Sequence, residues 1–400
     1  MSGDPPARTL VVLHVAEMSG PARSLLGRIA WLAERGAVEV LVPGPGPAAD
    51  LYSDIASVTQ LDYRALTLPR SAIEAAALAR RLRWEASTFR DRIRATRPDL
   101  VLCATAMLPG ALLAARREGV PALLYAAEIL ATGRSPVRRL GGRAVVRVAG
   151  SAASAVAACS GTVAAQYKRH DAAVMSPPIS DAFAGGDGPA FRARHRIPPD
   201  APLVLAVGSL SAGRGQHVLL DAVRRVQARV PDVRCTLAGV PFPRAADVEY
   251  ERRLRHDAAA LDARAEGASG AVTFCGFEPR IADAYAAASL VVNPARDPEA
   301  FGRVPCEALA ASRPVVATNV GATPEVLRDG ETALVVPPDD PVALAAGIEG
   351  LLLDSGRARS LAEAGRRDVL ERFAPERSLP TFTRLVLELT DRNRAIAPAP

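Results

Sequence analysis

Short apolar runs alternate with longer stretches of helical spacing along most of the chain. The apolar runs lie at residues 10–14, 38–42, 100–104, 122–125, 155–159, 203–207, 235–238, 272–274, 290–293, 315–317 and 333–336. The helical patterns between them lie at 71–95, 109–117, 218–230, 247–264, 304–311, 342–353 and 357–371. Strands that are buried on both faces read as nearly continuous apolar runs, and alternation with helices is typical of parallel sheets. The pattern therefore predicts an α/β protein with two doubly wound, Rossmann-like domains.

The boundary between the two series is expected in the segment 176–202. It contains Pro177–Pro178, Gly185–Gly186 and Pro198–Pro199, a composition typical of a hinge linker. We therefore predict a first domain over 1–185 and a second over 186–374. The helical segment 375–392 follows the second series and is expected to pack back on the first domain. Two such domains facing each other would leave a ligand cleft at the carboxyl ends of their strands.

Composition narrows the class of protein. Of the 400 residues, 49% are hydrophobic and 23% are charged, which excludes a disordered chain. No apolar run reaches about 18 residues, so no transmembrane helix is expected. Only 4% of residues are aromatic, which argues against a base-stacking nucleic-acid platform.

Charge and cysteine content point to the partners and the compartment. The net charge of +6 suits anionic phosphate substrates or a membrane surface. Lys168 is the single lysine, so nearly all cations are arginine. The five cysteines form no C-x-x-C pair, so neither disulfides nor a zinc site is expected, and the protein is predicted to be cytoplasmic.

The most informative stretch is 297–314, with the sequence DPEAFGRVPCEALAASRP. Glu299 lies in a strand-to-helix loop, and Glu307 lies in the first turns of the helix that begins near residue 304. The N-terminus of a helix attracts phosphate, here through the amides of Ala300, Phe301 and Gly302. Carboxylates beside such a site instead accept hydrogen bonds from hydroxyl groups. The combination predicts a ligand that carries both phosphate and hydroxyls, which is a nucleotide sugar.

This stretch resembles the donor-site signature of retaining GT-B glycosyltransferases, and most of all glycosyltransferase family 4. The matching pattern is Glu-x7-Glu with Phe-Gly between, then EALA and PVVA. The resemblance extends over most of the second domain and is weaker in the first. It is carried by VGSLSAGRGQHVLLDAV (207–223), TLAGV (236–240), VTFCGF (272–277), GATPEVLRDGETALVVPPDD (321–340), SGPARSL (19–25), RPDLVLCAT (97–105) and the segment 125–130.

The resemblance implies a retaining, metal-independent glycosyltransferase with no cofactor beyond its nucleotide-sugar co-substrate. UDP is the expected nucleotide, and the acceptor is expected to carry a hydroxyl in cell-envelope, saccharide or secondary-metabolite biosynthesis. Glu307 would hold the ribose hydroxyls, and Glu299 and Arg214 would be the catalytic residues. The donor site would also include Ala300, Phe301, Gly302, Arg303, Ser209, Gly208, Phe277 and Gly20.

The chain departs from the family at two donor-site cations. The arginine that usually follows the motif's glycine is replaced by Ser209, which removes a charge from the diphosphate site. The usual lysine is Arg214, which keeps the charge with a different geometry. Arg303 and Arg296 are candidates to replace the lost cation, although both also suit an ordinary protein surface.

The first domain lacks the histidine that many relatives place at a strand end near the reacting carbon. The matching region is 125–128, and none of the five histidines lies there. Glu128 is expected either to serve the acceptor pocket or to cap a loop. His14 follows the first apolar run and is either an acceptor-side residue or a structural one.

A local basic run comprises Arg134, Arg138, Arg139, Arg143 and Arg147. It resembles the basic helices through which lipid-glycosylating relatives touch membranes, but it also fits an acidic acceptor or a solvated arginine face.

Two other functions of the chain stay open. The first alternative is a non-catalytic nucleotide-sugar-binding protein. The second is a nucleotide-sugar epimerase or phosphorylase of the GT-B fold. Residues 44–47, Gly-Pro-Gly-Pro, lack the glycine spacing and the helix of a dinucleotide fingerprint.

Overall fold

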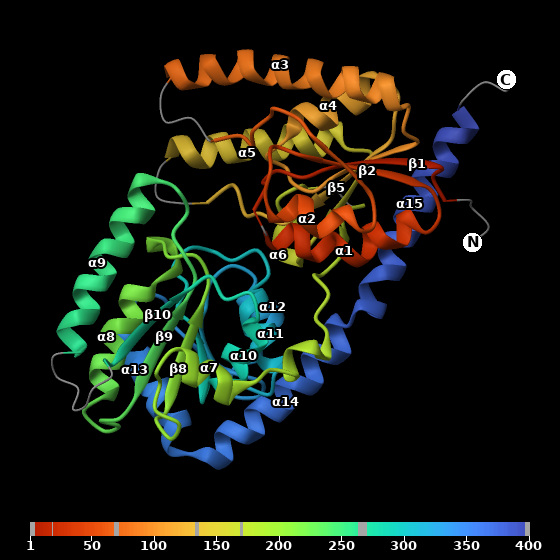
Figure 1. The fold of residues 1–400 in the computed structure, drawn as a ribbon. Helices are drawn as coiled ribbons and strands as arrows, with labels where there is room; N and C mark the ends of the chain where they lie inside the picture. The colour runs from red at the N-terminus through yellow and green to blue at the C-terminus, as the bar shows by residue number, and fades with distance from the viewer. Residues whose placement is uncertain are drawn as a thin grey trace. The chain divides into compact units, whose positions relative to one another are not determined.

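The structure is a computed structural model that describes residues 5–17, 19–67, 72–132, 136–168, 171–262 and 270–396. The chain forms two compact units (Figure 1). Unit 1 comprises Met1–Pro178 and Pro375–Pro400, and unit 2 comprises Ile179–Ala374. The sequence placed the boundary after residue 185, whereas the chain passes into unit 2 directly after Pro178.

Within its described part, unit 1 has seven parallel strands in the order β3-β2-β1-β4-β5-β6-β7. The strands are β1 Arg8–Val12, β2 Ala37–Val42, β3 Ser57–Gln60, β4 Leu100–Cys103, β5 Ala122–Ala126, β6 Ala155–Ala158 and β7 Ala173–Val174. The helices are α1 Gly20–Ala33, α2 Pro47–Ser53, α3 Ala72–Thr96, α4 Pro109–Arg117, α5 Pro136–Ala152, α6 Gly161–Ala165 and α15 Pro375–Ile396. The strand order reverses direction between β1 and β4, which is where ligands bind in doubly wound sheets.

In the part of unit 2 that the structure describes, six parallel strands follow the order β10-β9-β8-β11-β12-β13. They are β8 Leu203–Val207, β9 Arg234–Ala238, β10 Val272–Gly276, β11 Leu290–Asn293, β12 Val315–Thr318 and β13 Leu334–Val336. The helices are α7 Gly188–Arg194, α8 Gln216–Val226, α9 Ala245–Asp262, α10 Ile281–Ala287, α11 Arg303–Ala310, α12 Thr323–Val326, α13 Pro341–Leu353 and α14 Ser355–Phe373. Two 3-10 turns lie at Asp181–Ala184 and Ala212–Arg214. Here the order reverses between β8 and β11.

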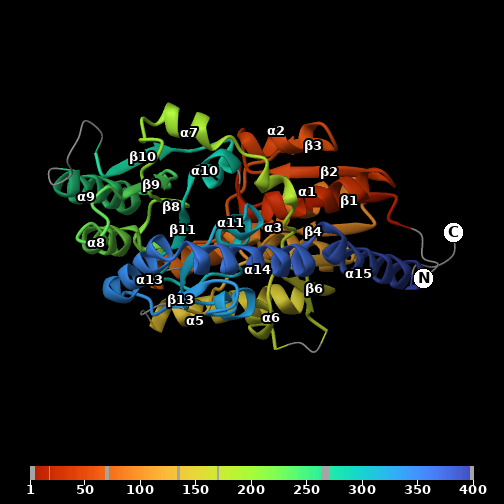
Figure 2. The same cartoon turned by 90° about the horizontal axis from the view of Figure 1, so that it is seen from below.

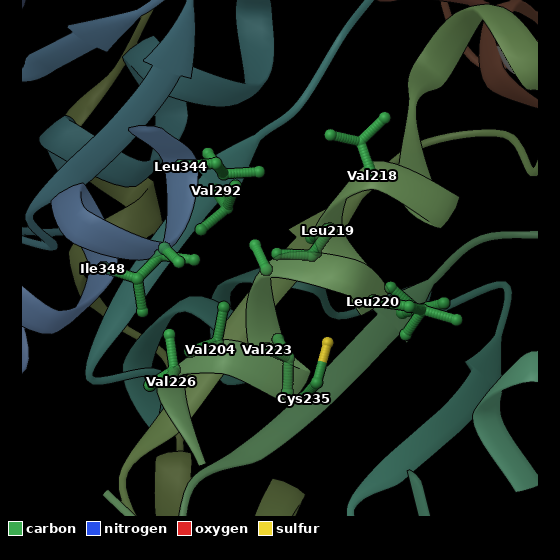
Figure 3. Packing of buried hydrophobic residues seen from close by; sticks show 14 of the residues in the cluster. Val204, Val218, Leu219, Leu220, Val223, Val226, Cys235, Val292, Leu344 and Ile348 are labelled. Atoms are coloured by element: carbon green, nitrogen blue, oxygen red, sulfur yellow. The ribbon is translucent and has the colours of Figure 1, made fainter. Parts of the chain in front are cut away.

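The core of unit 2 holds these two central strands in place. Helix α8 directs Leu219, Val223 and Val226 toward the sheet, at the spacing of one helical face (Figure 3). They pack with Val204 of β8 and Val292 of β11 in one buried cluster. Full burial of an aliphatic side chain contributes about 1.5–3 kcal/mol, so this cluster fixes the strands whose carboxyl ends carry the candidate site.

Part of the predicted linker 176–202 forms a 3-10 turn and helix α7 of unit 2. Asp187 caps helix α7 by accepting a hydrogen bond from the Ala190 amide at 2.9 Å. Gly188 lies so close to α10 that a Cβ atom there would come within 2.7 Å of the Ala286 carbonyl oxygen. Gly188 therefore permits close packing of α7 against α10.

The C-terminal helix α15 belongs to unit 1. Its side chains Phe382, Leu385, Val386 and Leu389 are buried at helical spacing. Phe382 meets Trp31 of α1 edge to face, with ring centroids 6.1 Å apart. Figure 2 shows α15 continuing from α14, so the chain returns to its first unit after completing the second.

The expectation that no helix follows residues 44–47 is wrong. Gly46 is the N-cap of α2, which begins at Pro47. Gly46 has a φ of 155°, and a Cβ there would lie 2.6 Å from the Ala16 carbonyl oxygen, so the position accepts only glycine. The glycine spacing of a dinucleotide fingerprint is still missing.

Candidate functional site

The loop between β11 and α11 carries the Glu-x7-Glu motif. It ends at Gly302, whose φ of 90° places it in the left-handed region just before the first residue of α11. The side chain of Phe301 is buried and packs edge to face on Phe373 of α14, with ring centroids 5.0 Å apart. Phe301 therefore anchors the loop with its ring, and only its backbone is placed to meet a ligand.

Glu299 is held at both its backbone and its side chain. Its carbonyl oxygen accepts a hydrogen bond from the Ala322 amide at 2.9 Å. Its carboxylate accepts a hydrogen bond from Asn293 Nδ2 at 2.6 Å and forms an ion pair with Arg214. The Glu299 side chain is 11% exposed and that of Arg214 is 43% exposed. The carboxylate is thus fixed, while its cationic partner reaches solvent.

Arg214 is positioned by close contact between the loops that follow β8 and β11. The Gly213 carbonyl oxygen accepts hydrogen bonds from the amides of Arg296 at 2.8 Å and Asp297 at 3.0 Å. Gly215, the residue after the 3-10 turn, has a φ of 73°. Since β8 and β11 flank the point where the strand order reverses, these contacts bring Arg214 and Glu299 to the expected binding edge of the sheet.

Glu307 is buried in the first turns of α11, so it is not a solvated helix-terminal glutamate. Its Oε2 accepts a hydrogen bond from the Tyr285 hydroxyl at 3.0 Å. Its Oε1 pairs with the Arg303 guanidinium at 2.8 Å. A carboxylate has about four lone-pair positions, so Glu307 retains capacity to accept further hydrogen bonds.

The remaining donor-site candidates of unit 2 follow β8 and β10. Gly208 has a φ of 138° and donates its amide hydrogen bond to Ala238 at 2.9 Å. The Ser209 carbonyl oxygen accepts from Gln216 Nε2 at 2.9 Å, which ties this loop to α8. Phe277 is 58% exposed directly after β10.

Both arginines that could replace the missing donor-site cation already form ion pairs with carboxylates. Arg296 pairs with Asp339, and Arg303 pairs with Glu307. Arg214 is also paired, but with the residue that the resemblance places next to the transferred sugar.

Unit 1 holds the other predicted residues. Gly20 is the exposed first residue of α1, which Ser19 caps by accepting a hydrogen bond from the Ala22 amide at 3.3 Å. His14 lies beyond the end of β1, and burial lowers the pKa of its imidazole to about 4. The ring is therefore neutral at neutral pH.

Glu128 follows β5, and its carboxyl group is shielded from solvent. Its Oε2 accepts a hydrogen bond from the Ala127 amide at 3.2 Å. Its Oε1 is also buried. Burial raises the pKa of Glu128 to about 7, because removal from water disfavours the charged form. The Glu128 carboxylate thus caps the chain at Ala127, and its role in the acceptor pocket stays a prediction.

The basic run of unit 1 lies on α5, except for Arg134, which is outside the described residues. Its other members, Arg138, Arg139, Arg143 and Arg147, are exposed. No helix in the described ranges is long and apolar enough to cross a membrane.

Two further residues, Asn293 and Tyr285, orient the two glutamates and were not predicted from the sequence. A polar residue closing the apolar run 290–293 is a signal for Asn293, since strand ends carry ligand contacts in parallel sheets. Tyr285 gives no such signal, because an aromatic residue in an alanine-rich helix reads as ordinary core.

The chain is similar to known proteins over the unit that carries this site. Residues 187–368 match the family described as glycosyl transferases group 1. D-inositol 3-phosphate glycosyltransferase of Streptomyces bingchenggensis is 33% identical over 208 residues, which are 50% of this chain and 44% of that protein. The lipopolysaccharide core biosynthesis glycosyltransferase LpsE of Rhizobium meliloti is 31% identical over 195 residues, which are 49% of this chain and 52% of that protein. The matches thus span about half the length of these curated relatives.

Solved structures resemble the whole chain. HepE of Anabaena, solved with UDP and glucose, has a TM-score of 0.76 at 21% identity and covers 96% of this chain and 99% of its own. Sucrose-phosphate synthase of Thermosynechococcus elongatus has a TM-score of 0.73 at 22% identity, with 96% and 99% covered. Residues 187–368 are therefore similar to glycosyl transferases group 1, and the chain has the two-domain, Rossmann-like α/β fold that HepE and sucrose-phosphate synthase share.

Proposed function

We propose that this protein is a glycosyltransferase that moves a sugar from a UDP-linked donor to a hydroxyl acceptor with retention of configuration. The observation that carries the proposal is the pairing of Arg214 with Glu299 beside the N-terminus of α11, with the buried Glu307 within the same helix. The similarity of unit 2 to glycosyl transferases group 1 supports it. HepE, which has the same fold, was solved with UDP-glucose.

The donor nucleotide is assigned to Glu307. Its carboxylate would accept hydrogen bonds from the two ribose hydroxyls. Tyr285 and Arg303 already hold both carboxylate oxygens, so the group is oriented before the donor arrives. This preorganisation lowers the entropic cost of binding.

The diphosphate is assigned to Arg214 and the first turn of α11. Amide groups of a helix N-terminus bind phosphate, and the Arg214 side chain is 43% exposed. A diphosphate would draw the guanidinium away from Glu299. The freed carboxylate, still held by Asn293, would then accept hydrogen bonds from hydroxyls of the transferred sugar.

The transfer step conserves atoms and charge without a protein nucleophile. The acceptor oxygen bonds to the anomeric carbon as the bond from that carbon to the phosphate oxygen breaks on the same face. The departing phosphate takes the acceptor proton. Arg214 stabilises the negative charge that develops on this phosphate, a contribution that commonly amounts to about 10²–10³-fold in kcat.

The acceptor is assigned to unit 1, with Glu128, His14 and Gly20 as candidate contacts. D-inositol 3-phosphate glycosyltransferases and LpsE are similar to this chain in sequence. That similarity supports an acceptor from cell-envelope or small-molecule glycoside biosynthesis.

Donor class and chemistry are tested first on the wild-type protein. A thermal-shift panel of UDP-glucose, UDP-N-acetylglucosamine and GDP-mannose identifies the nucleotide. Product analysis without acceptor then separates transfer from the alternatives, since an epimerase changes the sugar without an acceptor. A protein that binds donor but gives neither transfer nor hydrolysis with any acceptor in a screen would support the non-catalytic alternative.

Two variants test the residue roles. Arg214→Gln is expected to lower kcat about 10²-fold, while Arg359→Gln, an exposed arginine of α14, leaves it unchanged. Glu307→Gln is expected to weaken UDP binding in calorimetry by about 10–100-fold, since hydrogen bonds to charged groups contribute about 1.5–3 kcal/mol. Equal effects of the two arginine variants, or unchanged UDP affinity, would contradict these roles. Arg328 is unsuitable as a control because it pairs with the buried Asp368 at 2.8 Å.

A further inference from the structure

Helix α8 begins directly after the loop that carries Ser209 and Arg214, and its N-cap residue is Gly215, which has no side chain to cap the helix. The first four amides of a helix have no partner within it, and a side-chain oxygen at the N-cap usually satisfies one of them. Here the oxygen comes from the neighbouring helix α9 (Figure 1). The amide of His217, the second residue of α8, donates a hydrogen bond to the Tyr250 hydroxyl of α9 at 3.1 Å.

The Tyr250 hydroxyl makes two further polar contacts. It lies 2.9 Å from His217 Nδ1 and 3.3 Å from Gln216 Oε1. Tyr250 and Gln216 are buried, and the tyrosine ring meets the imidazole edge to face, with centroids 5.7 Å apart. A hydroxyl has one hydrogen and two lone pairs. All three contacts are satisfied together when His217 Nδ1 carries the imidazole proton and the hydroxyl donates to Gln216.

Gln216 extends this network to the donor loop. Its Oε1 accepts from Tyr250, and its Nε2 donates to the Ser209 carbonyl oxygen at 2.9 Å. The Gln216 side chain therefore joins the start of the loop 209–215 to the start of α8, and Arg214 lies between these two points. Because Gln216 holds one end of the loop and the His217 amide fixes the other, the backbone that presents Arg214 is braced at both ends.

We propose that Tyr250 is a positioning residue for the donor diphosphate: its hydroxyl holds the start of α8 and Gln216, and through them the loop that presents Ser209 and Arg214. The diphosphate role rests on the proposed function, whereas the bracing of the loop does not. The ring of Tyr250 alone would fill the core between α8 and α9. A buried hydroxyl is unfavourable unless it is hydrogen-bonded, and here all its hydrogen-bonding capacity is directed at the residues that end the loop.

Tyr250→Phe removes the hydroxyl and keeps the ring. In the full-length protein without ligand, amide hydrogen exchange of residues 208–216 is expected to become about 3–10-fold faster, because the loop opens more easily. The affinity for UDP in calorimetry is expected to fall by a similar factor of about 3–10, which corresponds to one lost neutral hydrogen bond.

Tyr63→Phe is the matched control, since it also removes a buried tyrosine hydroxyl. That hydroxyl contacts the carbonyl oxygens of Leu13 and Leu41 in unit 1, at 2.7 and 2.8 Å. Tyr63→Phe is expected to change neither the exchange of residues 208–216 nor the affinity for UDP.

A second variant tests the route through Gln216 and leaves α9 intact. Gln216→Leu has about the same volume but lacks the amide that joins Tyr250 to Ser209. It is expected to speed exchange of the loop and to weaken UDP binding as Tyr250→Phe does. Because both residues act through one chain of hydrogen bonds, the double variant Y250F/Q216L is expected to bind UDP as the single variants do. Two independent losses of stability would instead multiply.

Four outcomes would each overturn the proposal. They are unchanged exchange of residues 208–216 in Y250F, faster exchange with the UDP affinity of wild type, an equal loss of UDP affinity in Y63F, and fully multiplicative effects of Y250F and Q216L. Wild-type protein that binds no UDP would refute the proposed function and with it the diphosphate role. The exchange rates would then still decide whether Tyr250 braces the loop.

Discussion

Because the carboxyl group of Glu128 is shielded from water, the free energy of unfolding of unit 1 is expected to depend on pH. Burial raises the pKa of Glu128 from an ordinary value of 4.5 to about 7 in the folded protein. The folded state therefore favours the neutral acid. The stability that this group contributes is fully present below about pH 4.5 and is lost as the pH rises through about 7. The rise in pKa corresponds to about 3 kcal/mol.

Replacement of Glu128 by glutamine removes the titration and keeps a neutral side chain of the same size. The variant is expected to gain about 3 kcal/mol relative to wild type between pH 4.5 and pH 8, because wild type must either ionise in a buried place or unfold. Any pH-independent effect of the glutamine side chain, such as a changed hydrogen bond with the Ala127 amide, cancels when the difference between variant and wild type at pH 8 is compared with that at pH 4.5.

The assay uses a feature of the sequence. The two tryptophans of the chain, Trp31 and Trp84, both belong to unit 1. Urea unfolding followed by tryptophan fluorescence therefore reports on this unit, and coincidence with circular dichroism tests the two-state assumption. Glu34→Gln, whose carboxylate is 68% exposed, is the matched control. A difference between Glu128→Gln and wild type that stays constant from pH 4.5 to pH 8 would refute the argument.

Two further predictions concern the loop of the candidate site. Gly321→Ala is expected to destabilise unit 2 by about 1–3 kcal/mol and to lower turnover, since its Cβ would come within 2.5 Å of the Glu299 amide nitrogen. Gly330→Ala is the matched control, because Gly330 also has a positive φ, of 72°, but a Cβ there meets open space. This variant is expected to keep full turnover in enzyme assays. Equal losses of turnover in the two variants would mean that backbone strain, and not the clash with Glu299, is responsible. Phe301→Ala is expected to cost about 3–5 kcal/mol in chemical denaturation, because the ring packs on Phe373. A loss below 1 kcal/mol would show that this ring does not anchor the loop.

The sheets were predictable because burial on both faces leaves a strong signal in the sequence. The runs 203–207 and 290–293 coincide with β8 and β11, in which every residue except Val207 is buried. Short or partly exposed elements escaped this signal. Strand β3 at Ser57–Gln60 has no fully buried residue, and α7 lies in a stretch whose glycines and prolines read as linker.

The candidate site was predictable where one motif holds its residues together. Glu299, Gly302 and Glu307 share a single strand-loop-helix segment, so local spacing was enough to place them. The pairing of Arg214 with Glu299 joins two loops 85 residues apart in the chain, and Tyr285 reaches Glu307 from another helix, 22 residues away. Spacing along the chain carries no information about such contacts.

The sequence alone determined the α/β class, the two strand–helix series and the segment with the paired glutamates, because these depend on periodicity and on residues close together in the chain. The tertiary structure decided that Glu307 is buried, that one carboxyl oxygen of Glu128 is shielded from water, and that Arg214 pairs with Glu299. Burial and ion pairing depend on which distant segments meet. Only the packed chain fixes those distances, and with them the charge state of each group.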